Sequence, residues 1–287
     1  MPEMPEVESL ARFLDERCVE HTIARVDLAA FSALKTYDPP LSALHGLEVD
    51  GVTRRGKFLD ISAQGLHLVF HLARAGWLRW RDALTDAPVR PGKGPLALRV
   101  RLDNDSGFDL TEAGTQRKLA VYVVADPLSI PMVATLGPDP LTEQFDQAAL
   151  AALLAKAGRS QLKGVLKDQR IIAGIGNAYS DEILHAAKMS PFKPANSLSE
   201  AELTVLYDAI KGELAGAIKR AEGLAAKDLK GEKKSGMRVH GRKGETCPVC
   251  GDTIAEVSFA DSSLQYCPTC QTGGKKLADR RLSRLLK

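Results

Sequence analysis

Residues 247–270 read CPVCGDTIAEVSFADSSLQYCPTC, two C-x2-C motifs separated by sixteen residues. Two thiolates three residues apart can bind one side of a tetrahedral ion, and a second pair completes the shell at Zn–S distances of about 2.3 Å. We therefore predict that Cys247, Cys250, Cys267 and Cys270 bind one structural zinc ion, with no position left open for catalysis. The residues between the two motifs alternate in the way typical of a β-hairpin.

The same four cysteines would suit two disulfides in a secreted protein. No secretory signal is recognisable at the start of the chain, so we expect a protein of the bacterial cytoplasm and nucleoid with reduced thiols. The fifth cysteine, Cys18, falls on the apolar face of a predicted helix and is expected to be a buried hydrophobic residue.

Composition indicates a globular protein that carries its positive charge in two places. The chain has 287 residues, of which 44% are hydrophobic, and no stretch of about 18 apolar residues that would cross a membrane. Its net charge is +3, yet residues 219–243 alone contribute +6 and residues 271–287 contribute +5. Such clusters favour binding to a polyanion, because each neutralised phosphate releases counterions. Two solvated basic loops are the alternative.

The first half of the chain has the pattern of a β-sheet protein. Residues 5–18 predict a helix, since Pro5 suits the first turn and Val7, Leu10 and Leu14 form one apolar stripe. Short β-branched segments follow at 22–29, 47–53, 57–63, 66–72, 95–103 and 118–126. They predict an antiparallel β-sandwich.

The two prolines of LGPDPLT, residues 136–142, mark an interdomain linker. The periodicity then becomes helical at 146–157, 160–169, 178–188 and 198–221. The predicted fold class is α+β with several domains. We expect a β-sandwich, a helical domain with a basic linker, a zinc ribbon and a basic C-terminal tail, at residues 1–134, 135–240, 241–271 and 272–287.

The N-terminus carries a candidate nucleophile. Removal of Met1 would leave Pro2 with a free secondary amine, of which roughly 10% is neutral at pH 7 for an ordinary α-amino pKa. A neutral amine can attack an electrophilic carbon and form an iminium, as catalytic lysines do. The neighbouring Glu3 can move protons. Alone, this start is common among proteins, so its interpretation depends on the rest of the chain.

Five segments occur in a fixed order, and together they resemble one enzyme family. They are PEMPEVE at 2–8, GKFL at 56–59, GIGNAYSDEIL at 174–184, GRKGE at 241–245 and the four-cysteine ribbon. On these segments the chain is similar to the formamidopyrimidine-DNA glycosylase and endonuclease VIII family of base-excision repair, as a divergent, actinobacterial-type member. The resemblance extends to about Gln271 and implies a helix–two-turn–helix architecture for the helical domain.

The resemblance implies a catalytic role for three residues. Pro2 would attack C1′ of the damaged nucleotide, and Glu3 would protonate the sugar ring oxygen. Lys57 would hold the phosphate next to the lesion. β-Elimination, with δ-elimination able to follow, would then nick the strand. The zinc ion would be architectural.

The resemblance also implies contacts to DNA from the helical domain. Asn177 would bind phosphate in a turn where amides at a helix start favour anions. Lys163 matches a lysine near the DNA, and Glu182 matches an acid that the family places near the N-terminal amine. Without the family, Lys57 is an ordinary exposed strand lysine and Asn177 is a turn former.

Two loops depart from the family pattern. The segment HLARAG at 71–76 has Arg74 where the family usually has the methionine that fills the vacated base site. The segment EAGTQRKLA at 112–120 replaces the intercalation loop, and Arg117, Lys118 and Leu119 align with its Arg-Arg-Phe wedge. Leu119 would be a smaller wedge, since apolar side chains of several shapes enter base steps. The alternative is that residues 108–124 form a plain hairpin.

Further departures concern the substrate and the ribbon. Residues 222–240 are shorter than the loop that caps 8-oxoguanine in purine-specific members, which favours an endonuclease VIII-like or unusual base. Ser262 stands where the family has a phosphate-binding arginine in the ribbon. The basic tail, with Lys275, Lys276, Arg280, Arg281 and Arg284, would compensate as a DNA or partner contact.

We therefore predict a bifunctional DNA glycosylase/AP lyase that uses one structural zinc. The predicted catalytic residues are Pro2, Glu3 and Lys57, and the predicted DNA-binding residues are Lys57, Lys163, Asn177, Arg117, Leu119 and Arg74. The alternative is a catalytically weak damaged-DNA-binding protein on the same scaffold. An RNA- or ribosome-associated zinc-ribbon protein would leave the N-terminal motif unexplained. The expected partner is damaged DNA, duplex or partly single-stranded, bound by a monomer away from membranes.

Overall fold

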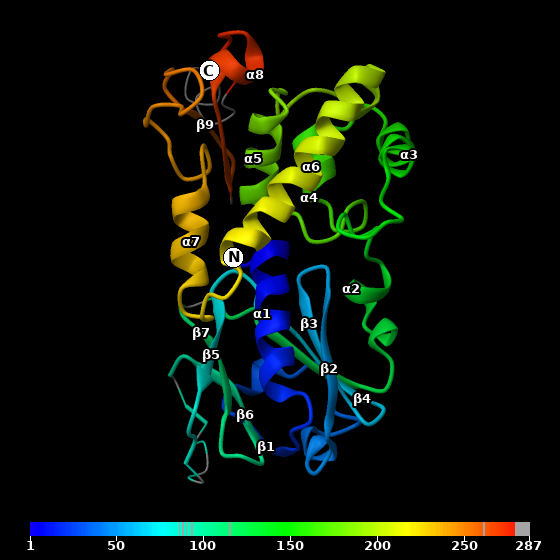
Figure 1. Cartoon of the computed structure of the whole chain (residues 1–287), viewed down its shortest axis with the longest axis vertical. Coiled ribbons are helices and arrows are strands. Elements are labelled where there is room, and N and C mark those ends of the chain that lie inside the picture. Colours follow the sequence, from blue (N-terminus) through cyan, green and yellow to red (C-terminus); the bar gives the residue numbers. More distant parts are fainter. Residues whose placement is uncertain are drawn as a thin grey trace. The chain divides into compact units, whose positions relative to one another are not determined.

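The computed structural model describes residues 1–85, 87, 89, 91–92, 94–114, 116–260 and 262–278. The chain divides into two compact units, both drawn in Figure 1. The first unit comprises Met1–Thr135 and Ala221–Gly231, and the second comprises Leu136–Arg220 and Glu232–Lys287. The tail residues Arg280, Arg281 and Arg284, predicted as DNA or partner contacts, lie outside the described residues.

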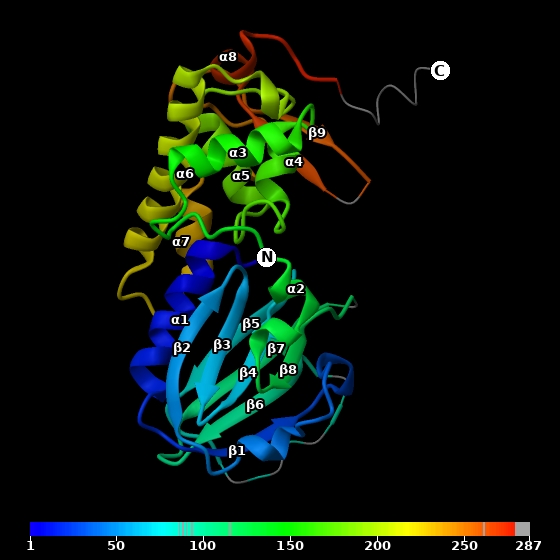
Figure 2. The same ribbon diagram turned by 90° about the vertical axis from the view of Figure 1, so that its right-hand side faces the viewer.

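The first unit is an antiparallel β-sandwich with a helix at its N-terminus, as predicted. One sheet has the strand order β1-β6-β7-β5 and the other has the order β2-β3-β4-β8 (Figure 2). Its elements are α1 (Met4–Cys18), β1 (Ile23–Leu28), η1 (Phe31–Ala33), η2 (Leu41–Leu44), β2 (Val49–Arg55), β3 (Phe58–Ala63), β4 (Leu66–His71), β5 (Gly76–Arg81), β6 (Leu96–Leu102), β7 (Gly107–Glu112), β8 (Ala120–Val124), η3 (Pro127–Ser129) and α2 (Pro131–Ala134).

A single apolar core fills the space between the two sheets and α1. Leu10 and Leu14 of α1 pack there with Phe70 of β4 and Phe108 of β7, all fully buried. Cys18 is also fully buried in this core, which confirms the sequence interpretation. Burial raises the pKa of its thiol to about 12, so the thiol stays protonated and unreactive.

Helix α1 is aligned with β2 by two side-chain contacts. Arg54 Nε of β2 donates to Glu8 Oε2 near the start of the helix at 2.9 Å. Asp15 Oδ1, near the end of the helix, accepts a hydrogen bond of 2.7 Å from the backbone N–H of Val52. Because β2 ends at Arg55, the turn that follows it is directed toward the N-terminal end of α1.

The sequence patterns missed β5 and β7. Strand β7 is buried along its whole length although it contains Asp109 and Glu112, so no polar face marks it as a strand. Arg99 holds the Asp109 carboxylate through two hydrogen bonds of 2.7 and 3.0 Å. The interpretation of residues 108–124 as a plain hairpin is wrong, because β7 pairs with β5 and β6 whereas β8 pairs with β4 in the other sheet.

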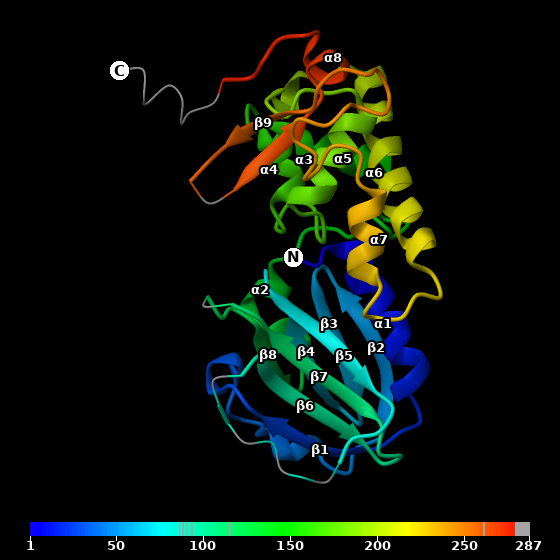
Figure 3. The ribbon, with the colours of Figure 1, turned by 90° about the vertical axis from the view of Figure 1, so that its left-hand side faces the viewer.

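The second unit is helical and contains the ribbon. Its elements are α3 (Gln147–Ala157), α4 (Leu162–Lys167), α5 (Asn177–Ala186), η4 (Ala195–Ser197), α6 (Glu200–Ala221), β9 (Ala255–Ser258), β10 (Ser263–Tyr266) and α8 (Pro268–Thr272), while α7 (Leu229–Gly236) crosses the division between the units. Helices α3, α4, α5 and α6 lie where the periodicity predicts them, whereas α7 and α8 were not predicted. Strands β9 and β10 pair antiparallel (Figure 3), which confirms the hairpin predicted between the cysteine motifs. None of the helices in the described chain has the length and apolar character needed to span a bilayer.

Candidate functional site

The predicted nucleophile lies directly before α1. Met1 is 49% exposed, whereas Pro2 and Glu3 are buried. The backbone N–H of Glu3 donates to Glu6 Oε2 at 2.8 Å, and the two glutamates form a reciprocal capping box at the helix start. The cap fixes the direction in which the chain enters α1, and therefore the position of Pro2.

Lys57 lies in the turn between β2 and β3. Gly56 takes a positive φ of 58°, which a residue with a side chain rarely adopts, and its carbonyl accepts from Arg54 Nη1 at 3.2 Å. The Glu8–Arg54 pair fastens this turn to the start of α1. Lys57 is 7% exposed, so it is a buried lysine and not the ordinary exposed strand lysine of the alternative interpretation.

His71 is a polar residue of this region to which the sequence analysis gave no role. It ends β4 opposite Phe58, the residue after Lys57, and its ring contacts the Phe58 ring at 4.8 Å between centroids. Its Nδ1 accepts a hydrogen bond of 3.1 Å from the backbone N–H of Ala73. Burial, together with the charge of Lys57, lowers the His71 pKa to about 4. The sequence feature that could have identified His71 is its position in HLARAG, at the end of a buried strand.

The loop after β4 presents Arg74. Ala73 adopts a left-handed φ of 52°, and Gly76 lies so close to the carbonyl of Leu72 that a Cβ would sit 2.1 Å from that oxygen. The tight turn holds Ala73 buried and leaves Arg74 exposed. Since His71 pairs with Phe58, this loop and the Lys57 turn lie at the same end of the sandwich.

The segment after β7 buries Leu119. Leu119 is 1% exposed and packs in the sandwich core, and its insertion between bases stays a prediction. The buried Glu112 carboxylate accepts the backbone N–H groups of Lys118 and Leu119 at 2.8 to 3.1 Å, which fixes the returning strand. Arg117 is exposed, and its Nη2 donates to the carbonyl of Gly94 at 3.0 Å.

In the second unit, Asn177 opens α5 with Gly176 as its N-cap. Its Nδ2 donates to the carbonyl of Ser263 in β10 at 2.8 Å, and its Oδ1 is buried without a partner among the described residues. The backbone N–H of Gly174 donates to Gln169 Oε1 at 2.9 Å. The α5 start is therefore linked directly to the ribbon hairpin.

Lys163 supports this turn from inside. Its side chain is 7% exposed, and its ammonium donates to Asp181 Oδ1 at 2.6 Å, Ser180 Oγ at 2.9 Å and the Asn177 carbonyl at 3.0 Å. A buried ammonium with these partners stabilises the turn, and the contact of Lys163 with DNA stays a prediction. The Asp181 carboxylate also accepts His240 Nδ1 at 2.7 Å.

Glu182 is buried and braces the segment that leads into the ribbon. Its carboxylate accepts the backbone N–H groups of Arg238, Val239 and His240 at 2.8 to 2.9 Å. Arg238 also pairs with Glu213 at 2.6 Å, and this pairing helps to keep the pKa of the guanidinium above its usual value although burial acts against it. Within the second unit, Glu182 is a structural acid.

Part of the basic stretch 219–243 is neutralised by nearby carboxylates. The pairs within the second unit are Arg220–Glu232, Arg238–Glu213, Arg242–Glu245 and Lys243–Glu256, at 2.6 to 3.0 Å. Net charge in the sequence therefore overstates the number of cations that this stretch can offer to a polyanion.

The four cysteines of the ribbon converge on one point. Their Sγ atoms all lie within 4.8 Å of one another, with Cys250–Cys267 at 3.3 Å and Cys247–Cys270 at 3.9 Å. Tetrahedral zinc with bonds of about 2.3 Å needs sulfurs about 3.8 Å apart, whereas a disulfide needs about 2.05 Å. The cysteines are free thiols, so the two-disulfide alternative is wrong and the set fits one structural zinc. His185 Nε2 lies 3.3 Å from Cys247 Sγ and ties the site to α5.

Three family models match successive parts of the chain. They are the formamidopyrimidine-DNA glycosylase N-terminal domain over residues 1–121, the formamidopyrimidine-DNA glycosylase H2TH domain over residues 136–228, and a zinc finger found in FPG and IleRS over residues 244–273. The last match covers the four-cysteine cluster and agrees with its geometry.

Known proteins resemble both the sequence and the fold. A formamidopyrimidine-DNA glycosylase of Symbiobacterium thermophilum is 35% identical over 294 aligned positions, covering 98% of this chain and 93% of that protein. An uncharacterized formamidopyrimidine-DNA glycosylase-like protein of Mycobacterium tuberculosis is 60% identical over 157 residues, 55% of this chain and 98% of that protein. The crystal structure of Lactococcus lactis formamidopyrimidine-DNA glycosylase, bound non-covalently to DNA containing an AP site, superposes with a TM-score of 0.81 at 28% identity, covering 94% of this chain and 99% of that one. Matches that cover nearly the whole chain on both sides establish that it belongs to the formamidopyrimidine-DNA glycosylase family.

Proposed function

We propose that the chain is a bifunctional DNA glycosylase and AP lyase of base-excision repair. One observation carries the proposal: the Glu8–Arg54 and Asp15–Val52 contacts direct the Lys57 turn toward the end of α1 where Pro2 and Glu3 lie. A nucleophile, a proton carrier and a cation for phosphate then share one end of the first unit. The family membership and the DNA-bound relative of Lactococcus lactis support the same activity.

Removal of Met1 would expose the Pro2 amine at a buried position. The half-exposed Met1 is open to an aminopeptidase, and burial of Pro2 favours the neutral amine over the charged form. The Pro2 nitrogen would bond to C1′ as the bond from C1′ to the base breaks, and loss of the nitrogen proton would give a neutral aminal. Glu3 would then protonate the sugar ring oxygen, so that the bond from C1′ to this oxygen breaks and the nitrogen lone pair forms the C1′=N bond of the iminium.

The iminium would then direct strand cleavage. It acidifies the C2′ protons, and removal of one of them expels the 3′ phosphate by β-elimination. Lys57, kept in its turn by Arg54, would hold the phosphate beside the lesion. The damaged base must leave the stack first, at a cost of a few kcal/mol that is smallest for damaged pairs.

The second unit would bind the DNA backbone. We assign phosphate contact to the start of α5 at Asn177, whose Nδ2 is held by the carbonyl of Ser263. The zinc ribbon would set the position of that carbonyl, so that the metal supports binding and takes no part in the chemistry. Arg74 and Arg117, both exposed in loops at the end of the sandwich, are proposed as further contacts.

A catalytically weak damaged-DNA-binding protein is the second candidate. The observations that favour it are the burial of Leu119, the candidate wedge, and Ser262 in place of a ribbon arginine. Both changes would weaken the binding of the protein to DNA with an opened base pair. Neither change removes Pro2 or Glu3.

Borohydride trapping on DNA with one abasic site tests the proposal. Borohydride reduces the iminium to a stable amine, so the wild-type protein should form a covalent adduct that peptide mass analysis locates on Pro2. Pro2→Gly should reduce the yield strongly, whereas Pro5→Ala, the matched change three residues on, should keep it. Absence of an adduct from a protein that has lost Met1 and still binds DNA would favour the second candidate.

A further inference from the structure

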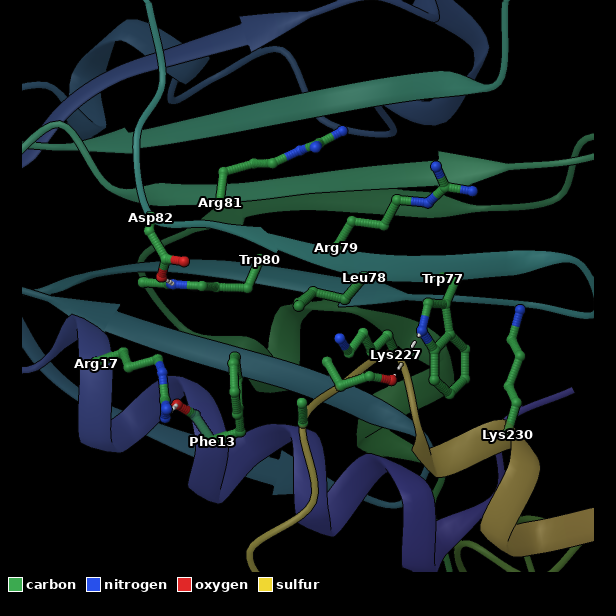
Figure 4. Close-up of a pocket in the computed structure, with 12 residues that line it drawn as sticks. Phe13, Arg17, Trp77, Leu78, Arg79, Trp80, Arg81, Asp82, Lys227 and Lys230 are labelled. Carbon is green, nitrogen blue, oxygen red and sulfur yellow. Dashed lines mark hydrogen bonds between the residues drawn. The ribbon is translucent and has the colours of Figure 1, made fainter.

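A pocket of about 670 Å³ lies in the first unit, at the edge of the sandwich between β5 and α1 (Figure 4). Its lining residues are Phe13, Arg17, Trp77, Leu78, Arg79, Trp80, Arg81, Asp82, Ala225, Ala226, Lys227 and Lys230. Phe13 comes nine residues after Met4, about 14 Å along the helix axis at 1.5 Å per residue. The pocket therefore extends away from Pro2, and the proposed chemistry does not use it.

The floor of this pocket, which we call the β5 pocket, is aromatic. The Phe13 ring meets Trp80 edge to face, with centroids 5.8 Å apart. Trp77 is 7% exposed, and its Nε1 donates to the carbonyl of Ala226 at 3.1 Å. Trp80 Nε1 donates to Asp82 Oδ1 at 2.9 Å. Both indole N–H groups are thus already bonded within the protein.

The rim of the pocket is cationic. Arg81 pairs with Asp109, and Arg17 pairs with Glu16. Arg79, Lys227 and Lys230, by contrast, form no ion pair with any carboxylate in the described part of the chain. Lys230 Nζ lies 4.4 Å from the centre of the Trp77 ring, and burial together with the charge of Arg79 lowers its pKa. Like charges gathered without a counter-ion form a site that an anion would stabilise.

The shape and chemistry fit an acidic peptide better than a nucleotide. A stacked base would need an open aromatic face, but Lys230 covers a face of Trp77 and the Phe13 ring meets Trp80. A peptide needs only a slot for one apolar side chain and cations for its carboxylates. Strand β5 is also the edge of its sheet, pairing with β7 alone among the described strands, so an extended segment can add beside it.

We propose that the β5 pocket binds an extended acidic segment of a partner protein. An aromatic or large aliphatic side chain of that segment packs against the Phe13–Trp80 pair, and its carboxylates pair with Arg79, Lys227 and Lys230. This inference goes beyond DNA repair chemistry and does not depend on it, since it makes the first unit a docking module for another protein.

Fluorescence anisotropy on the full-length, zinc-loaded protein tests the inference. The probe is a fluorescein-labelled peptide with one phenylalanine flanked on both sides by aspartates. We expect saturable binding that weakens at least tenfold in Arg79→Glu/Lys230→Glu, and at least tenfold when alanine replaces the peptide phenylalanine. Lys35→Glu and Lys156→Glu, which reverse exposed charges elsewhere, should bind as the wild type does.

Two results would overturn the inference. One is equal affinity of the wild type and the Arg79→Glu/Lys230→Glu variant for the peptide. The other is displacement of the peptide by a short single-stranded oligonucleotide that itself requires Arg79 and Lys230, which would assign the pocket to nucleic acid. If the reversed variant has a lower melting temperature, Arg79→Gln/Lys230→Gln removes the charges without adding repulsion and gives the same comparison.

Discussion

At the scale of single residues, His71 shows how burial and a neighbouring charge decide the state of a side chain. Its pKa of about 4 follows from burial first and from Lys57 second, and its Nδ1 accepts the N–H of Ala73. The ring is therefore neutral in the folded protein at neutral pH. A neutral ring beside Lys57 leaves the lysine as the cation of this turn.

The depressed His71 pKa predicts a pH-dependent stability. Between pH 6.5 and pH 4 the unfolded state binds a proton that the folded state does not, so stability is lost as the pH falls. We expect roughly 2 kcal/mol of the loss between pH 7 and pH 5 to come from this group. In His71→Asn, the Asn Oδ1 can accept the Ala73 N–H but does not titrate, so this variant should lose less stability between pH 7 and pH 5 than the wild type does, by that amount. Urea unfolding of both proteins at the two pH values measures the difference. Equal losses in both proteins would refute the assignment.

Motifs gave the positions of the candidate residues but not their surroundings. Pro2, Glu3 and Lys57 could be named from PEMPEVE and GKFL. The same kind of alignment could not show that Lys163 is paired with a buried aspartate or that Leu119 lies in the core. Burial depends on which distant segments pack around a residue, and neither composition nor spacing contains that information.

At the scale of elements, the Lys163–Asp181 pair joins α4 to α5. Both side chains are nearly inaccessible, so removing one partner leaves a charge that water cannot reach. We expect Lys163→Met to lower the free energy of unfolding by about 3 to 5 kcal/mol, measured with urea. The exposed Lys156→Met is the matched control and should change it by less than about 0.5 kcal/mol. A loss of the same small size for Lys163→Met would mean that Asp181 is satisfied by His240 alone.

The zinc ribbon and α5 form one cooperative element. Asn177 and Ser263 are hydrogen-bonded across them, and His185 lies against Cys247. Loss of zinc in Cys250→Ser should therefore speed amide hydrogen exchange in β9, β10 and the first turn of α5, while β3 and β4 keep their protection. Cys18→Ala should keep one zinc per chain by metal analysis. Unchanged exchange in α5 would show that the ribbon moves independently.

Elements with regular periodicity were predictable, and those with buried charges were not. Helices α3 to α6 and the cysteine hairpin follow from spacing alone. Strand β7 could not be predicted, because its buried Asp109 is paired with Arg99 of β6 and no local sequence pattern reveals that partner. The hairpin interpretation of 108–124 failed for a related reason, since β7 and β8 belong to different sheets.

At the scale of the whole molecule, ion pairs reduce the positive charge available to DNA. Lys234 of α7 is exposed and has no ion pair among the described residues, so it can contact a phosphate. We expect Lys234→Gln to reduce the magnitude of the slope of log K against log salt by about 0.9, the value for one phosphate contact. Arg242→Gln should change it much less, because Arg242 is already paired with Glu245. Binding to a labelled duplex at several salt concentrations provides both slopes. Identical changes in the two variants would show that the pairing does not persist on DNA.

The first unit is discontinuous in sequence, since Ala221–Gly231 complete it after the whole stretch 136–220 has intervened. Trp77 is bonded to the carbonyl of Ala226, and Leu229 packs in the sandwich core. During synthesis at roughly 5–20 residues per second, the sandwich therefore waits on the order of ten seconds on the ribosome for its last segment. Until then Trp77 lacks the segment Ala221–Gly231 that packs on it, so the nascent sandwich is open to chaperones. A chain that terminates before this segment would stay open to them.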